Sequence, residues 1–208
     1  MARSDAGAGA GAGVRERQRE QTRRALLREG RTLFAGRGYA DVGLAELVAA
    51  AGVTKGALYH HFPGGKTDLF RAVLDEVQQE VGARVASAAD AHDDEWSRLT
   101  VGCREFLAAA TAPGIDRIML VDGPAVLGWN AWRAMDEAAS ARHLEESLAA
   151  LVEEGTLAPQ PVPPLAHLLS GAMNEAALWL ASSGEGPEAL EDTTAALLRM
   201  LDGVRAHG

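Results

Sequence analysis

The segment GVTKGALYHHF, residues 52–62, concentrates the side chains best suited to binding chemistry. If a helix begins at Thr54, its spacing turns Lys55, Tyr59 and His60 outward. An exposed lysine can donate hydrogen bonds to guanine O6 and N7 or to phosphate, and the two ring side chains can contact phosphates or thymine methyl groups. The segment therefore favours recognition of double-stranded DNA.

The start of this helix offers further contacts. Thr54 is a good N-cap residue, and backbone N–H groups at a helix start can donate to phosphate. Gly56 allows the helix to approach DNA closely, whereas Leu58 and Phe62 are expected in the core. Together with nearby basic and capping residues, the predicted DNA-contact set is Arg23, Gly43, Thr54, Lys55, Gly56, Ala57, Tyr59, His60, His61 and Lys66.

Short helices must position these residues. Residues 15–38 predict an amphipathic helix that ends at its glycines, and residues 44–51 predict a second, very short helix that ends before Gly52. The third helix is expected from Thr54 to about Phe62. Two short helices joined by a glycine-containing turn are typical of a helix-turn-helix.

Charge is divided unevenly over the 208 residues, whose net charge is −9. Residues 1–71 hold 12 basic and 7 acidic side chains, whereas residues 72–208 hold 8 basic and 22 acidic ones. This asymmetry indicates a small basic module attached to an acidic body, which suits a nucleic-acid partner for the module alone. Charge by itself leaves open the alternative that the arginines only form a solvent-exposed helix face.

The remaining chain also predicts helices, about nine in total, so the expected fold class is all-α. The later helices are expected near 93–112, 125–154, 164–182 and 187–206. We predict three regions: a flexible Ala/Gly-rich tail at 1–14, a helix-turn-helix domain at 15–63 and a helical body at 64–208. No secretory signal, membrane-spanning run or cysteine pair is visible, so we expect a cytoplasmic protein.

Catalytic and metal-binding alternatives find little support. Gly65-Lys66-Thr67 resembles the end of a phosphate-binding loop, but the pattern requires glycine at the position of His60. His60-His61 point in different directions on a helix, and His92 lies among acids typical of a solvated helix start. We therefore expect no enzyme, metal or cofactor.

One set of residues resembles the DNA-binding region of the TetR family of bacterial transcriptional regulators. The set consists of Gly30, Gly38, Tyr39, the segment AGVTKGALYHHF, and Lys66, Asp68, Leu69 and Phe70. The segment DRIMLVDGPAVLGWNAWR resembles the ligand domain of some members. The resemblance implies a three-helix DNA-binding domain, a connecting fourth helix, a ligand-responsive body and a dimer formed by the last two helices. Two departures are Val42-Gly43, where the family often has Thr or Ser, and a PGGK loop that is one residue longer than usual.

We therefore predict a homodimeric repressor that binds a palindromic operator and is released by a small apolar or aromatic effector. Alternatives are an activator or a ligand-independent regulator of the same fold and, from another class, a carrier or enzyme that uses the body pocket. Large and polarizable side chains predict the effector site: Cys103, Phe106, Met119, Trp129, Trp132, Met135, Asn174 and Trp179. Apolar helical spacing predicts the dimer interface: Leu165, Leu168, Leu169, Ala172, Ala176, Leu180, Leu197, Leu198 and Leu201.

Overall fold

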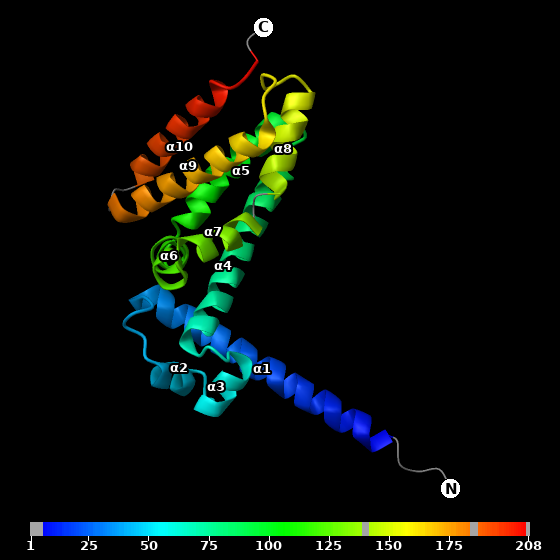
Figure 1. Ribbon diagram of the computed structural model, residues 1–208, viewed down its shortest axis with the longest axis vertical. Coiled ribbons are helices and arrows are strands. Elements are labelled where there is room, and N and C mark those ends of the chain that lie inside the picture. The colour runs from blue at the N-terminus through cyan, green and yellow to red at the C-terminus, as the bar shows by residue number, and fades with distance from the viewer. Residues whose placement is uncertain (1–5, 139–141, 184–186, 207–208) are drawn as a thin grey trace. The chain divides into compact units, whose positions relative to one another are not determined.

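The computed structural model describes residues 6–138, 142–183 and 187–206 (Figure 1). This part of the chain holds ten α-helices, α1–α10, the named π-helical segment η1 and no named strand, which confirms the all-α prediction. The chain divides into two compact units, one that ends at Val73 and one that begins at Leu74.

The first unit contains α1 (Ala6–Arg37), α2 (Leu44–Ala50), α3 (Lys55–His61) and the start of α4 (Lys66–Ala89). Helices α1, α2 and α3 contact one another pairwise, as the helix-turn-helix pattern predicts. Burial of their apolar faces accounts for this packing. The fully or almost fully buried side chains are Leu26, Leu27, Phe34, Val42, Leu47, Leu58, Phe62, Leu69, Phe70 and Val73.

Helix α1 begins earlier than the sequence predicts. Residues 6–14 are helical rather than a flexible tail, whereas residues 1–5 lie outside the described residues. Alanine is the strongest helix former, and extending an existing helix is easier than nucleating a new one. The amphipathic segment that follows therefore extends toward the N-terminus despite the alternating glycines.

The unit boundary lies after Val73, ten residues beyond the predicted boundary at residue 63. The first turns of α4 belong to the first unit because Phe70 packs with Phe34 and Tyr39, at ring-centroid distances of 5.3 and 5.1 Å. This aromatic cluster completes the core under the helix-turn-helix.

The second unit, which we call the body, contains the rest of α4 and seven further elements. These are α5 (Glu95–Ala110), η1 (Arg117–Asp122), α6 (Gly123–Leu127), α7 (Trp129–Asp136), α8 (Arg142–Glu153), α9 (Val162–Ser183) and α10 (Pro187–Asp202). Asp94 caps α5, since its carboxylate accepts a hydrogen bond of 2.8 Å from the backbone N–H of Ser97. In the described residues, no helix is long and apolar enough to cross a membrane.

The single helix predicted over 125–154 is instead divided into several elements. Gly128 ends α6 with a φ of +80°, a left-handed conformation that favours glycine and interrupts the helical path. Residues 139–141, between α7 and α8, lie outside the described residues. The segment before Asp122, for which no helix is predicted, forms η1.

Candidate functional site

Helix α3 owes its position to its N-cap and one buried side. The hydroxyl of Thr54 accepts a hydrogen bond of 3.1 Å from the backbone N–H of Ala57, which confirms Thr54 as the N-cap. Leu58 is fully buried and Phe62 is almost fully buried. This packing fixes α3 against α1 and α2, and it leaves the opposite side of α3 open.

The open side carries the residues that the sequence singles out. Thr54, Lys55, Gly56, Tyr59 and His60 are exposed, and we call them the recognition surface. The ammonium group of Lys55 lies 6.0 Å from the centre of the Tyr59 ring. Donors, an aromatic face and a small residue thus share one surface, which suits contact with phosphates and base edges.

The loop after α3 supports Tyr59. Gly65 has a φ of +66°, and a Cβ atom at this position would lie 3.2 Å from the Cε1 atom of Tyr59. Glycine therefore serves two needs here, the left-handed backbone and the close approach of the tyrosine ring. The additional glycine in the PGGK loop brings the chain beside the recognition surface.

Lys66, for which the sequence predicts a phosphate contact, has a structural role within the first unit. Its ammonium group donates to the backbone carbonyls of Tyr39 and Val42, at 2.8 and 2.9 Å, and lies 3.9 Å from the centre of the Tyr39 ring. Two of its three donors are therefore used inside the first unit. Lys66 connects the loop before α2 to the start of α4.

The other predicted DNA contacts lie around this surface. Ala57 and His61 are half-buried, and Arg23 is half-buried with its guanidinium 5.8 Å from the Phe62 ring centre. The pKa of His61 is lowered, mainly by burial and then by the charges of His60 and neighbouring arginines. Gly43 is exposed at the N-cap of α2 and offers no side chain, although its carbonyl accepts a hydrogen bond of 3.1 Å from Leu47.

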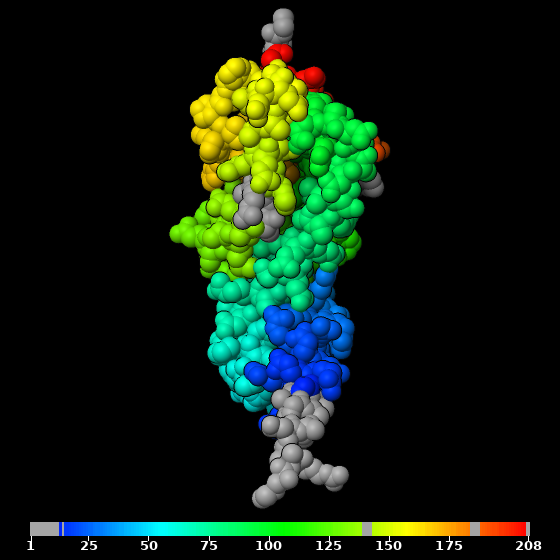
Figure 2. Space-filling model, turned by 90° about the vertical axis from the view of Figure 1, so that its right-hand side faces the viewer, coloured from blue at the N-terminus to red at the C-terminus, as the bar shows by residue number. Residues whose placement is uncertain are grey.

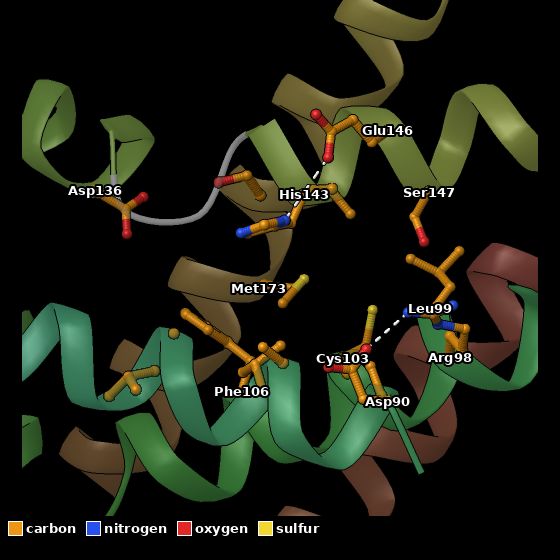
Figure 3. A pocket seen from close by; sticks show the side chains of 18 of the residues that line it. Asp90, Arg98, Leu99, Cys103, Phe106, Asp136, His143, Glu146, Ser147 and Met173 are labelled. Carbon is orange, nitrogen blue, oxygen red and sulfur yellow. Dashed lines mark hydrogen bonds and ion pairs between the residues drawn. The ribbon is translucent and has the colours of Figure 1, made fainter. Parts of the chain in front are cut away.

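A second candidate site is a cavity of about 500 Å³ inside the body. Its walls come from α4, α5 and α8, with additions from η1, α7 and α9, and Figure 3 shows several lining side chains directed toward the shared space. Figure 2 views the body from the side on which α4 and α8 lie. Enclosure by several helices is typical of small-molecule sites.

Three predicted effector-site residues line this cavity: Cys103, Phe106 and Met119. The thiol of Cys103 is almost completely buried, and this burial raises its pKa to about 12. Cys103 is therefore an apolar wall residue rather than a nucleophile at neutral pH.

The predicted tryptophans lie elsewhere. Trp132 is buried behind the wall, where its indole N–H donates to the carbonyl of Met119 at 2.8 Å, and Trp129 is 63% exposed with its ring centre 5.0 Å from that of Trp132. Met135 is half-buried and does not line the cavity. Trp179 is 48% exposed. Helical spacing correctly groups Trp129 and Trp132, but it cannot tell a wall residue from one packed behind the wall.

Polar groups meet next to the apolar wall. The buried carboxylate of Asp136, which lines the cavity, accepts hydrogen bonds of 2.8 Å from Asn174 and from Arg133. Arg133 also donates to Ser170 at 3.1 Å. Asn174, which the sequence predicts as an orienting group in the pocket, is buried and does not line the cavity. It is connected to the wall by its hydrogen bond to Asp136. Burial is the main cause that raises the pKa of Asp136, and these two hydrogen-bond donors oppose the rise.

Sequence reasoning misses two walls of the cavity, α4 and α8. On α4, Gln78 lies one turn before Val81 and Gly82, and all three line the cavity. The only sequence signal is a glutamine within an apolar stripe. Gln78 is 3% exposed, and neither amide atom has a hydrogen-bond partner in the part of the chain that is described.

Ionic side chains also line the cavity. Arg98 pairs with Asp90 at 2.7 Å and lies 3.9 Å from Glu95, while His143 lies 3.7 Å from Glu146. Within the described ranges, no group of three His, Cys, Asp or Glu side chains is placed to hold a metal ion.

The predicted dimer residues divide between two faces. Leu169, Leu180, Leu197 and Leu201 are buried within the body, so the structure contradicts their assignment to an interface. They face inward because α9 packs against α5, α8 and α10, and α10 packs against α5. Four others are half-buried, Leu165, Ala172, Ala176 and Leu198, and only Leu168 is largely exposed. The exposed large apolar side chains of α9 and α10 are Leu168, Leu178, Trp179 and Met200, which we call the apolar face.

Two family models cover most of both units. Residues 26–73 match the bacterial regulatory proteins of the tetR family, and residues 96–204 match the tetracyclin repressor-like C-terminal domain. This chain belongs to the TetR family. It is a transcriptional regulator, and the TetR-family relatives it matches are regulators of transcription rather than enzymes.

Solved structures resemble most of the chain. A TetR-family transcriptional regulator from Pectobacterium atrosepticum is 34% identical, with 91% of this chain and 97% of that chain covered and a TM-score of 0.79. RolR, solved in complex with resorcinol, is 22% identical, with 89% of both chains covered and a TM-score of 0.69, and shows the same fold.

Curated TetR-family relatives match shorter stretches. The transcriptional regulator LmrA of Bacillus subtilis is 33% identical over 73 residues, which are 35% of this chain and 39% of LmrA. The Tn10 TetC protein of Escherichia coli is 26% identical over 152 residues, 73% of this chain and 76% of that protein.

Proposed function

We propose that this TetR-family protein is a homodimeric repressor that binds a palindromic operator and releases it when a small molecule fills the cavity of the body. One observation carries the proposal: the chain combines an exposed recognition surface on α3 with a partly open cavity in the body that several helices line. The exposed surface suits a large polyanion, and the cavity suits a small effector with an apolar or aromatic part.

On DNA, α3 enters the major groove by its N-terminal end. Lys55 donates to a guanine edge or a phosphate, while Tyr59 and His60 contact the backbone or a thymine methyl group. The exposed guanidinium groups of Arg19 and Arg24 on α1 supply contacts that do not depend on sequence. Each subunit reads one half of the operator.

The apolar face of α9 and α10 forms the dimer interface. On α9, Leu168 and Trp179 are 11 residues apart, which is three turns of helix, so they lie on one side. Gly171 lies between them on that side, is exposed, and lets a partner helix approach closely. Large apolar side chains exposed on adjacent helices are typical of a subunit interface.

Effector binding acts through α4. This helix supplies residues up to Val73 to the first unit and lines the cavity with Val81 and Val85 in the body. A molecule that fills the cavity displaces α4 and changes the separation of the two recognition helices from about 34–36 Å, one turn of DNA. The affinity for the operator then falls.

The first experiment measures binding of the full chain to DNA from upstream of its own coding region, by gel shift and fluorescence anisotropy. We expect a saturable complex that competes poorly with unrelated DNA and weakens as salt rises. Binding that does not distinguish this fragment from unrelated DNA would contradict an operator-specific regulator.

The second experiment tests the interface by light scattering at micromolar concentration. We expect a dimer, and we expect Leu168→Glu combined with Trp179→Glu to give a monomer that keeps its helical circular-dichroism spectrum. Val121→Glu is the matched control, because Val121 is also an exposed apolar side chain but lies on η1. A wild-type monomer with full helicity would refute the dimer.

A further inference from the structure

Gln78 is the polar side chain in the cavity wall that the fold itself leaves unsatisfied. It lies on the same side of α4 as Val81, Gly82 and Val85, at the helical spacing i, i+3, i+4 and i+7, and all four line the cavity. The side chain is 97% buried, and both its amide oxygen and its amide nitrogen lack a partner within the described residues. An unpaired buried amide destabilises the folded protein, so its retention here requires an explanation.

The neighbouring glutamine shows how unusual this position is. Gln79 is exposed, and its amide nitrogen donates to Asp75 at 2.9 Å one turn earlier on α4. Glutamine on this helix is therefore ordinary at the surface and exceptional in the wall. The Gln78 carboxamide has one donor group and one acceptor atom to offer to a molecule in the cavity.

The charges in the wall argue against an anionic partner. Four carboxylates line the cavity: Asp90, Glu95, Asp136 and Glu146. Within the described wall, the guanidinium of Arg98 is already paired with Asp90, and His143 lies beside Glu146. An added negative charge would meet this excess of carboxylates, of which Asp136 is buried and Glu95 half-buried, whereas Asp90 and Glu146 are exposed.

Apart from these groups and from Gln78, Ser147 and Ser170, the wall is apolar. Valine, leucine, cysteine, phenylalanine and methionine side chains come from three helices: Val81, Val85, Leu99, Cys103, Phe106 and Met173. Such a wall favours a hydrocarbon or aromatic body on the ligand, since burial of this body releases it from water.

We propose that Gln78 is the polar anchor of the effector site, and that the effector is an uncharged amphiphile. One end carries a group that both donates and accepts hydrogen bonds, such as a carboxamide, and pairs with Gln78, while an apolar body lies along the α4 and α5 wall. This assignment rests on the proposed function, because it takes the cavity as the effector site.

The test uses three probes with the same ring system: 2-naphthamide, 2-methylnaphthalene and 2-naphthoate. Equilibrium dialysis against the full-length protein without DNA measures each dissociation constant. We expect 2-naphthamide to bind about tenfold or more tightly than 2-methylnaphthalene, and 2-naphthoate to bind most weakly. Failure of 2-naphthamide to bind at its solubility limit, or tightest binding by 2-naphthoate, overturns the proposal.

Two variants assign the preference to one residue. Gln78→Met keeps the shape of the side chain but removes its hydrogen bonds, so we expect 2-methylnaphthalene to bind at least as tightly as 2-naphthamide. Gln79→Met is the matched control and keeps the wild-type order. An unchanged order in Gln78→Met would overturn the proposal and assign the amide to structural or solvent contacts only.

The operator assay separates this inference from the function on which it rests. If 2-naphthamide binds through Gln78 without weakening the operator complex, the effector role of the cavity is refuted while the anchor stands. If the probes weaken the operator complex with no difference between them, the effector role stands and the anchor is refuted.

Discussion

The recognition surface and the cavity hold their polar side chains in opposite environments. On α3, Lys55 and Tyr59 are exposed to solvent, because the buried Leu58 on the other side of the helix fixes its orientation. In the body, Gln78 and Asp136 are buried beside a partly open cavity. A large charged partner such as DNA needs donors that are already accessible, whereas a small molecule is selected by groups that water reaches poorly.

The difference has an energetic consequence. Residues of the recognition surface contribute little to the stability of the free protein, so their replacement affects binding above all. Residues around the cavity are part of a core, so their replacement affects folding as well as binding. Four predictions test this contrast, from the largest expected effect to the smallest.

The strongest effect is expected for Trp132→Ala in the body. The substitution removes a buried indole and its hydrogen bond to Met119, so we expect the free energy of unfolding to fall by about 3–5 kcal/mol. Trp129→Ala is the matched control, because Trp129 is mostly exposed, and it should change the value by no more than roughly 0.5–1 kcal/mol. Urea denaturation followed by circular dichroism gives both values, and equal losses would contradict the assignment of Trp132 to the core.

On the recognition surface, we expect Lys55→Ala and Tyr59→Ala each to weaken operator binding by about 1–3 kcal/mol. The unfolding midpoint should hardly change, because both side chains are exposed. Arg104→Ala, which removes an exposed cation from α5, is the control and should leave the affinity unchanged. Fluorescence anisotropy with the upstream DNA measures the effect, and undiminished binding by the double variant would place the recognition surface elsewhere.

The buried carboxylate of Asp136 gives a pH-dependent prediction. Because its pKa is raised in the folded protein, the folded state holds this proton at pH values where the unfolded chain has lost it. The free energy of unfolding of the wild type, compared with that of Asp136→Asn, should therefore fall as the pH rises from about 3.8 to the raised pKa, and should stay level at higher pH. The total fall is ~1.4 kcal/mol for each unit by which folding raises the pKa of Asp136. Urea denaturation between pH 4 and 7 tests this, with Asp192→Asn, on the exposed side of α10, as control. A difference that grows in favour of the wild type with rising pH would refute the role of burial.

The smallest effect is expected for Gly56→Ala, and it should have opposite signs for folding and binding. An added methyl group meets only the Thr54 hydroxyl at 3.9 Å, and alanine is the better helix former, so stability should rise by up to ~1 kcal/mol. Operator affinity should nevertheless fall if α3 approaches DNA closely at this residue. Gly36→Ala in α1, where an added methyl group meets no atom within 4 Å, should stabilise the protein without loss of affinity. An undiminished affinity for Gly56→Ala would place this part of α3 away from the DNA.

Most of the DNA-binding unit could be predicted from local sequence. The Thr54 cap and the buried Leu58 and Phe62 follow from spacing within one short helix. Lys66 could not be assigned in this way, because its partners are backbone carbonyls more than twenty residues away. A lysine that faces phosphate and one that holds a loop have the same local pattern.

The cavity was less accessible to sequence reasoning, because distant helices form it. Cys103, Phe106 and Met119 are correctly placed in the wall, but α4 and α8 are missed as walls. Aromatic content misled the prediction, since Trp129 is mostly exposed and Trp132 supports the wall from behind. For Gln78, only the packed body reveals that a glutamine in an apolar stripe has no partner.

The origin of the cavity wall in six different elements has an evolutionary consequence. A single substitution on α4, α5 or α8 alters one side of the space, while the residues that we propose to read the operator are gathered in and beside one seven-residue helix. Selection can therefore change the inducing compound stepwise and keep the promoter constant. A library that varies Gln78, Leu99 and Ser147 would yield a panel of biosensors that all report through the same reporter gene.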